Sequence, residues 1–230
     1  MSDPNKPFLL LCTRAMRQER QAVADAILEC MTLARLPEPP TIQDYGHYRS
    51  PEWRDEEGAL RPYLSVDWYI AEAWNLAKAK LDATQLMKTL AAEPWRRKEL
   101  IGDHYDVWLV DQEMYDEAQT EADPDVVSFS RNLVGLVVSA RPFEAVGTPT
   151  YSLVKTVVLH ELGHLFGLPD IRRPDVALDA APHCTNTCVM RQASHGQEDW
   201  QQLTTDRLTH GPYCEKCLGE LRTLFQLAGD

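Results

Sequence analysis

The sequence predicts a mixed α/β fold, in which a β-sheet is backed by one long buried helix. The chain has 230 residues, of which 44% are hydrophobic, and this is enough to build one sizeable core. Short apolar runs typical of strands alternate with amphipathic runs of helical period. Residues 150–167, TYSLVKTVVLHELGHLFG, combine helical spacing with a mostly apolar surface. We therefore expect layers of secondary structure packed around one core.

We assign the whole chain, residues 1–230, to a single domain with three segments. Residues 1–64 hold an N-terminal strand, a helix and a long loop. Residues 65–167 hold helices, the sheet and the long buried helix. Residues 168–230 hold a loop, a cysteine-rich segment and a C-terminal helix.

The net charge of −12 and the pI near 5.0 argue against nucleic-acid or anionic-membrane partners, since both need clustered Lys and Arg. Residues 7–12 are too short a run for a signal peptide and are followed by arginines, not by a cleavage site. No run is long enough to span a membrane. We expect a monomeric cytoplasmic protein, where cysteines are thiols or metal ligands and not disulfides.

The elements follow in order. Residues 7–13 are typical of a strand and residues 17–36 of an amphipathic helix. Residues 37–63, rich in proline, charge and aromatic side chains, have no sustained period and predict a long surface connection. Such a loop either shapes a substrate cleft or is a plain irregular insertion.

The second segment begins with two helical patterns, residues 66–81 and 82–92, the latter capped by Asp82 or Thr84. Three strands are predicted after them, at 105–110, 126–130 and 133–138. We place residues 133–140 near the edge of the sheet, where a peptide could be added as a further strand. The long helix is predicted to start after Thr148, with Pro149 at its first position, and to close at Gly167.

This helix carries the pattern H-E-x-x-H. His160 and His164 are one turn apart on one face, so their neutral nitrogens can bind one Zn²⁺. Glu161 then reaches a metal-bound water and acts as the general base. The alternative is two histidines that merely hydrogen-bond inside a core, but unpaired polar groups in an apolar run are costly.

Residues 168–182, LPDIRRPDVALDAAP, predict a loop because they contain three prolines and many charges. Two close cysteine pairs come after it, Cys184 with Cys188 and Cys214 with Cys217. Four thiolates at this spacing can form a closed tetrahedral zinc site, with a short helix between the pairs. Disulfides and redox thiols are the alternatives, and the compartment disfavours both.

The run HELGHLFGL, followed by His183-Cys184, Cys188-Val189-Met190 and the last cysteine pair, resembles the archaemetzincins. Their pattern is H-E-x-x-H-x-x-G-x-x-H-C-x₄-C-x-M, then C-x-x-C. The resemblance covers about residues 80 to 220, with strong motifs only after His160. It implies a metzincin-like fold, one catalytic zinc, one four-cysteine zinc and a methionine, here Met190, beneath the catalytic metal.

The chain departs from that pattern in two places. The first cysteine pair is C-x₃-C, and fifteen residues separate Gly167 from His183 where the pattern has two. Asp170 moreover occupies the expected position of the third zinc ligand, which looks like the ending used by the snapalysin group of metzincins. We favour His183 as the third ligand, because Cys184 anchors it and a longer loop costs little free energy. Asp170 remains the alternative, as a ligand or in the outer shell.

The sequence therefore predicts a zinc metallopeptidase with two zinc ions per chain and a peptide or protein substrate. Glu161 is the catalytic base, and His160, His164 and His183 hold the catalytic zinc. Cys184, Cys188, Cys214 and Cys217 hold the structural zinc. Two alternatives stay open: an inactive zinc-stabilised interaction protein of the same fold, and a zinc amidase acting on a non-peptide substrate.

Overall fold

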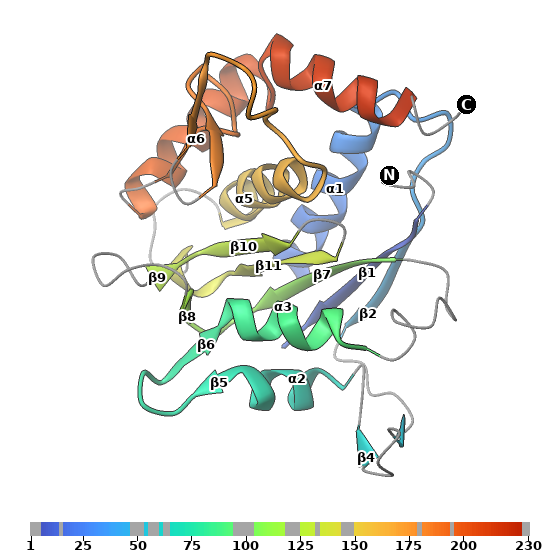
Figure 1. Cartoon of the computed structure of the whole chain (residues 1–230), viewed down its shortest axis with the longest axis vertical. Coiled ribbons are helices and arrows are strands. Elements are labelled where there is room, and N and C mark those ends of the chain that lie inside the picture. Colours follow the sequence, from blue (N-terminus) through green and yellow to red (C-terminus); the bar gives the residue numbers. More distant parts are fainter. Residues whose placement is uncertain are drawn as a thin grey trace.

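The fold is a mixed α/β arrangement built on a five-stranded sheet (Figure 1). The computed structural model describes residues 6–13, 16–46, 53–54, 60–61, 65–93, 104–117, 125–131, 134–143, 150–178, 181–193 and 196–226. In spatial order the strands are β10 (Ser128–Arg131), β11 (Gly135–Ser139), β7 (Tyr105–Val110), β1 (Phe8–Cys12) and β2 (Ile42–Gly46). All neighbouring strands are parallel except β10, which pairs antiparallel with β11. The predicted fold class is confirmed.

Helices cover both faces of this sheet, so its central strands β1, β7 and β11 are buried on both sides. α1 (Arg17–Leu33) and α5 (Thr150–Leu165) pack on one face, and α2 (Val66–Ala73) and α3 (Ala83–Ala91) pack on the other (Figure 1). Leu10 of β1 joins the α1/α5 core, whereas Leu11 joins the α2/α3 core. This alternation follows from the period of two along a strand.

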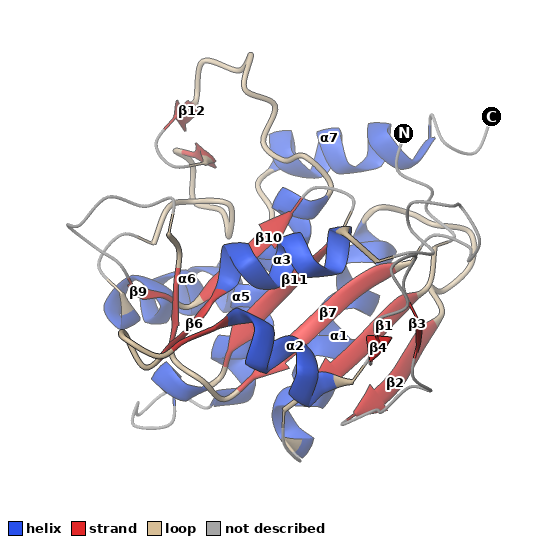
Figure 2. Cartoon of the chain, turned by 60° about the horizontal axis from the view of Figure 1, so that its bottom comes forward, coloured by secondary structure: helices blue, strands red, loops and turns tan. Residues whose placement is uncertain are grey.

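The remaining elements are short strands and the C-terminal helices (Figure 2). A four-stranded sheet contains β5 (Trp74–Asn75), β6 (Lys80–Asp82), β8 (Met114–Tyr115) and β9 (Asp125–Val126). Two hairpins pair β3 (Trp53–Arg54) with β4 (Leu60–Arg61), and β12 (Val176–Leu178) with β13 (Pro182–Cys184). A short 3₁₀ helix, η1 (Arg141–Phe143), follows β11, and α6 (Gln197–His210) and α7 (Glu215–Gln226) end the described chain. Within the described ranges, no helix has both the length and the apolar character needed to cross a bilayer.

The strongest local signals of the sequence are confirmed. Strand β7 has the predicted bounds, and the Asp82 side chain caps α3 by accepting a hydrogen bond from the backbone N–H of Gln85. Gly167, at φ +83°, closes α5: its N–H bonds to the His164 carbonyl and the N–H of Leu168 bonds to Gly163. The predicted N-terminal cap at residues 148–149 lies outside the described residues.

The first helix is shorter than predicted. It ends at Leu33 because Arg35 adopts φ 64°, so that its N–H bonds to the Thr32 carbonyl and the N–H of Leu36 bonds to Met31. This bonding pattern is the usual glycine-type helix ending. An arginine at that position gives no stop signal, so the sequence pattern extended the helix to residue 36.

The predicted long surface connection over residues 37–63 is corrected where the structure describes it, because it contains strands. The segment contributes β2, which pairs parallel with β1 at the edge of the main sheet. Its middle residues are exposed and polar, as is common for edge strands, and so the apolar alternation expected of a strand is missing. The Asp44 side chain accepts a 3.0 Å hydrogen bond from Arg20 Nε of α1, which ties the strand to that helix.

The single helix predicted for residues 66–81 was also wrong. α2 stops at Ala73, and the chain then forms the β5–β6 hairpin. The Asn75 side chain closes the turn by accepting hydrogen bonds from the N–H groups of Ala77 and Lys78, at 3.0 and 3.1 Å. Asn competes with helical backbone bonds in this way, and β6 is then paired with β8.

Residues 133–140 were expected near the edge of the sheet, and β11 lies there, between β7 and β10. Among the described strands, β10 is the edge strand on this side.

The loop prediction for residues 168–182 is corrected, because Val176–Leu178 forms β12 and pairs with β13. The sequence pattern did not indicate this strand, because its pairing partner decides that it forms.

We predict that Gly135→Ala destabilises the protein, because an added Cβ would lie 2.3 Å from the backbone oxygen of Asp106 on the neighbouring strand. A backbone contact cannot move aside, so the free energy of unfolding should fall by about 1–3 kcal/mol. Gly219→Ala in α7 is the matched control, since a Cβ there meets nothing within 4 Å. It should raise stability by about 0.4–1 kcal/mol in urea unfolding. Equal effects of the two substitutions would contradict this packing.

Candidate metal centre and cleft

Helix α5 presents two histidines and a glutamate from a buried position. His160 and Glu161 are only 4% and 5% exposed. Met190 packs against the helix between the histidines: a Cβ added at Gly163 would lie 2.1 Å from the Met190 sulfur. A glycine is thus required on this turn because the methionine occupies the space of a side chain.

The structure brings His183 to the pair on α5, forming a histidine triad (His160, His164 and His183). One nitrogen of each ring lies within 4.8 Å of the others. The His183 ring centroid is 5.4 Å from that of His160 and 5.1 Å from that of His164. His183 lies on β13, opposite Ala177 of β12, so the hairpin formed by the insertion (residues 168–182) and β13 determines where the ring stands.

The tautomers of His160 and His164 are those that can bind a cation through Nε2. His160 Nδ1 lies 2.6 Å from the Val189 carbonyl oxygen, and His164 Nδ1 lies 3.1 Å from that of Leu168. A carbonyl oxygen only accepts, so both Nδ1 atoms must carry the proton and both Nε2 atoms keep a lone pair. These Nε2 atoms are 3.0 Å apart, so their lone pairs repel each other unless a positive ion binds both.

The protonation state of His164 supports the same conclusion. Burial lowers the pKa of His164 well below its ordinary value, and the neighbouring His160 and His183 lower it further. His164 is therefore neutral near pH 7, which is the form that binds metals. Three imidazole nitrogens are a donor set typical of catalytic zinc sites.

Asp170, the alternative third ligand, lies outside this group. Its carboxylate accepts two hydrogen bonds from Arg172 Nε at 2.9 and 3.0 Å, and its backbone N–H donates to Glu220. The Arg172 hydrogen bonds lower the pKa of Asp170 to about 2. Among the described residues, the metal-ligand group at α5 contains His183 and not Asp170.

Glu161 has a hydrogen-bond partner that the sequence did not suggest. Ser128 Oγ of the edge strand β10 donates to Glu161 Oε1 over 2.6 Å. An isolated serine in a strand is an ordinary residue, and only the pairing of β10 beside α5 brings it here. This contact fixes one carboxylate oxygen and leaves the other available for a proton.

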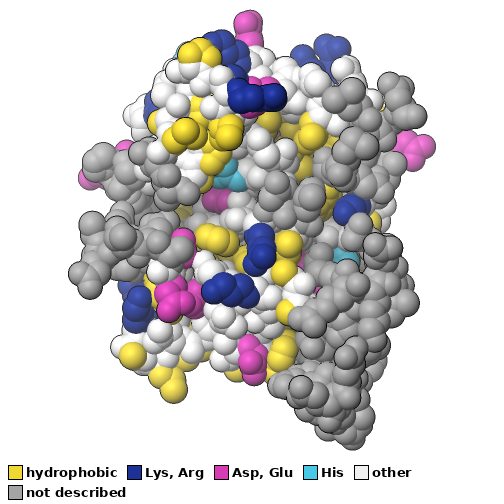
Figure 3. Space-filling view, viewed as in Figure 1, with side chains coloured by type: hydrophobic (Ala, Val, Ile, Leu, Met, Phe, Trp, Pro, Cys, Tyr) yellow, Lys and Arg dark blue, Asp and Glu magenta, His cyan; other side chains and the backbone are white. Residues whose placement is uncertain are grey.

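A cleft of about 1950 Å³ opens onto the triad. Its lining includes residues 126–130 on β9 and β10, residues 168–172 of the insertion, and parts of α6 and α7. Figure 3 shows histidine and acidic side chains at the bottom of a hollow in this face. The N–H of Ser139 bonds to the Val127 carbonyl, so the alternation of the antiparallel ladder turns the backbone groups of Ser128 and Ser130 outward, away from β11.

A second cluster, the four-cysteine centre, lies beside the triad and consists of Cys184, Cys188, Cys214 and Cys217. All four cysteines are free thiols, and their sulfurs lie within 4.8 Å of one another. Hydrogen bonds from Cys188 and Cys217 lower the pKa of the Cys184 thiol, which favours a thiolate. Four sulfurs in this arrangement are the donor set of a closed zinc site.

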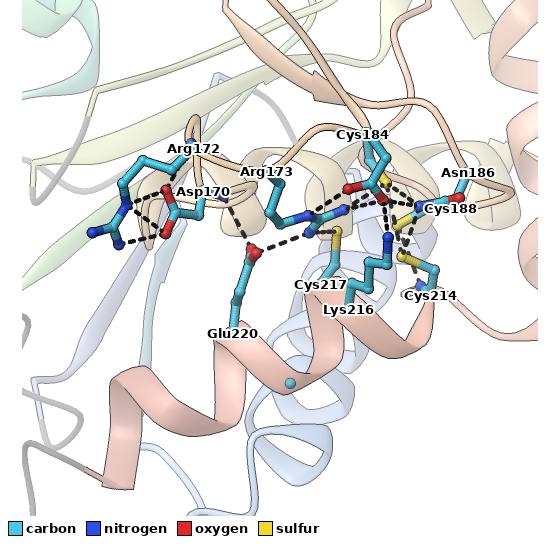
Figure 4. Close-up of polar contacts among 12 residues, drawn as sticks. Asp170, Arg172, Arg173, Cys184, Asn186, Cys188, Cys214, Lys216, Cys217 and Glu220 are labelled. Atoms are coloured by element: carbon cyan, nitrogen blue, oxygen red, sulfur yellow. Dashed lines mark hydrogen bonds and ion pairs between the residues drawn. The ribbon is translucent and has the colours of Figure 1, made fainter.

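Two side chains donate hydrogen bonds to this centre: Arg173 of the insertion, and Asn186 of the loop between Cys184 and Cys188 (Figure 4). Arg173 Nη1 donates to Cys217 and Nη2 to Cys184, each at 3.3 Å, and Asn186 Nδ2 lies 3.4 Å from the Cys184 sulfur. No sequence motif indicates a role for Arg173 or Asn186. The local signal was weak, because an arginine eleven residues before a cysteine has no defined spacing to it.

A third polar group lies on the other side of the sheet. Glu93, His104 and Asp106 are buried together, next to the α2/α3 core. Glu93 accepts a hydrogen bond from the Tyr69 hydroxyl, and His104 Nε2 lies 3.5 Å from Asp106 Oδ1. The Tyr69 contact gives the buried Glu93 carboxylate a hydrogen-bond partner within the fold.

Solved structures share this fold over nearly the whole chain. Archaemetzincin from Methanopyrus kandleri superposes with a TM-score of 0.61 at 17% identity, covering 98% of each chain. Archaemetzincin from Archaeoglobus fulgidus, in complex with malonate, gives 0.58 at 13% identity, over 93% of this chain and 99% of that one. A zinc-dependent peptidase from Methanocorpusculum labreanum gives 0.57 at 12% identity, with the same coverage. No protein-family model and no curated protein sequence matches the chain. The chain therefore has the archaemetzincin fold, as its resemblance to that family implied.

We predict that Gly163→Ala lowers the free energy of unfolding by about 1–3 kcal/mol, because the new methyl group overlaps the Met190 side chain. Met190→Ala alone should also destabilise, through a cavity. Together the two changes should cost less than their sum, since the smaller residue 190 removes the overlap. Strict additivity in a double-mutant cycle, measured by urea unfolding, would show that this contact is absent.

Proposed function

We propose that this protein is a zinc-dependent peptidase, in which His160, His164 and His183 hold a catalytic zinc and Glu161 is the general base. One observation carries the proposal: the two Nε2 lone pairs of α5 face each other at the floor of a cleft, beside Glu161. The archaemetzincin fold supports it, since one protein of that fold is described as a zinc-dependent peptidase.

Each residue of the site has a distinct role in the proposed hydrolysis of a peptide bond. When bound, zinc supplies Lewis-acid activation of water and of the substrate carbonyl near neutral pH. Glu161 accepts the proton of the attacking water and returns it to the leaving amine. Ser128 holds the carboxylate in place through Oε1. The carbonyl groups of Val189 and Leu168 keep the imidazoles in the tautomer that ligation requires.

The edge strand β10 is suited to bind the substrate. The outward N–H and C=O groups of Ser128 and Ser130 line the cleft, and a peptide in extended conformation can pair with them as an added antiparallel strand. Pairing of this kind recognises peptide backbone, which favours a peptide over a non-peptide amide. The nearby Glu161 favours turnover over a purely structural role for the metal.

We further propose a second, structural zinc in the four-cysteine centre. The closed set of sulfurs has no free position for substrate, so this ion stabilises the fold. It needs thiolates, and therefore a reducing compartment such as the cytoplasm. The alternatives, an inactive interaction protein and an amidase, are distinguished by the outcome of the assays below.

We predict that Glu161→Gln retains both zinc ions and the wild-type Tm but lowers kcat/KM on a peptide library by about 10²–10⁴, since only the proton acceptor is lost. Glu113→Gln is the matched control, because Glu113 lines the same cleft, is exposed and pairs with Lys80. It should stay near wild type. Wild-type-like hydrolysis by the Glu161 variant refutes the base. A wild type that cleaves no peptide refutes the peptidase, and hydrolysis of non-peptide amides alone supports the amidase.

We predict that the third ligand is His183, and that the wild-type protein contains two zinc ions per chain. His183→Ala should lower the affinity of the catalytic zinc by more than about 100-fold, beyond the 10- to 100-fold typical of outer-shell losses. Asp170→Ala should change it much less, because Arg172 holds that carboxylate. Zinc analysis after graded chelation measures both. Retention of metal by the His183 variant with loss by the Asp170 variant would assign Asp170 as the ligand.

A further inference from the structure

The guanidinium of Arg173 binds sulfur and carboxylate groups at the same time. Besides its contacts to Cys184 and Cys217, Arg173 Nε and Nη2 donate to Asp175 at 3.1 and 2.9 Å, and Nη1 donates to Glu220 at 3.0 Å. The side chain is only 13% exposed. Figure 4 shows it between the insertion, the cysteines and helix α7.

Every N–H of this guanidinium is used. Arginine has five donors, one on Nε and two on each terminal nitrogen. Three of them go to carboxylate oxygens and two to sulfur atoms of different cysteines. A lysine has three donors around a single nitrogen and cannot form this planar set of contacts. The position therefore requires arginine chemistry, beyond its positive charge.

The hydrogen bonds from Arg173 to the sulfurs offset negative charge at the four-cysteine centre. Four thiolates around one Zn²⁺ leave two net negative charges, and the carboxylates of Asp175 and Glu220 add two more nearby. Lys216 Nζ lies 3.1 Å from Asp175, so this ion pair offsets the charge of a carboxylate and not that of a sulfur. Among the described residues, Arg173 is the cation whose hydrogen bonds reach the cysteine sulfurs directly.

We propose that Arg173 is a positioning residue of the four-cysteine centre: its two N–H···S bonds stabilise the thiolates, and the insertion that carries it thereby increases the zinc affinity of this centre. The inference rests on the proposed structural zinc. It gives a role to the insertion, whose fifteen residues stand where the archaemetzincin sequence pattern has two. Because Cys184 follows His183 directly on β13, the same contacts also hold the hairpin that carries a ligand of the triad.

A simpler role for Arg173 would be a tether from the insertion to α7 through Glu220. The two roles have different consequences. Loss of a tether lowers Tm but leaves the sulfur electrons unchanged. Loss of the N–H···S bonds lowers metal affinity and raises the energy of the sulfur lone pairs, since outer-shell hydrogen bonds tune ligand basicity. A measurement on the metal–sulfur bond therefore separates them.

The experiment compares full-length wild type with Arg173→Met, Arg173→Lys and the control Arg172→Met. Arg172 is adjacent in sequence, but its side chain is 86% exposed and contacts Asp170. Zinc retention is measured against a graded chelator, with analysis of the metal remaining. Protein refilled with Co²⁺ gives sulfur-to-cobalt charge-transfer absorption, which reports only the four-cysteine centre because the triad has no sulfur.

We expect both Arg173 variants to lose the structural metal at about 10- to 100-fold lower chelator concentration than wild type. Their charge-transfer band should move to lower energy, and Arg172→Met should match wild type. Should Arg173→Met fail to fold, Arg173→Lys carries the comparison. Wild-type metal retention and an unmoved band in Arg173→Lys, with or without a lower Tm, would overturn the inference. A wild-type protein that binds one metal ion per chain and shows no sulfur-to-cobalt band would instead refute the structural zinc on which it rests.

Discussion

The structure depends on two backbone carbonyl groups that hold imidazole rings. The Val189 and Leu168 oxygens accept from the Nδ1 atoms of His160 and His164, so both Nε2 atoms must point together with their lone pairs free. Both carbonyls belong to segments that follow α5 in the chain. The long apolar helix supplies a rigid spacing, and the folded segments around it determine the tautomer.

Those segments are themselves held by the four-cysteine centre. Cys188 precedes Val189, and the N–H of Cys184 bonds to the Met190 carbonyl, so the turn under α5 and the strand carrying His183 are joined. Val189 donates its N–H to Pro212, just before the second cysteine pair. The backbone around the cysteines is thus joined to the backbone that orients the His160 ring. The insertion contributes through Arg173 from the outside.

The cleft takes its character from the edge of the sheet. Among the described strands of the main sheet, β10 alone pairs antiparallel and lies at the edge, and its residues line the cleft. An exposed edge invites pairing with other chains, and here it is short and lies beside Glu161. The same strand therefore offers backbone groups for an extended peptide and a serine for the proposed base. The four residues of β10 thus link the sheet to the proposed active site.

The sequence by itself determined the features that depend on spacing along one element. His160, Glu161 and His164 share a helix, and Gly167 ends it. Asp82 caps α3, and YDVWLV is an apolar strand. Each of these features follows from contacts within a few residues. Only the tertiary structure decided which distant segments meet. It made residues 42–46 a strand, divided residues 66–81, placed β10 at the edge, and brought Ser128 to Glu161 and Arg173 to the cysteines. Such pairings depend on packing between segments far apart in the chain, for which neither periodicity nor propensity carries a signal.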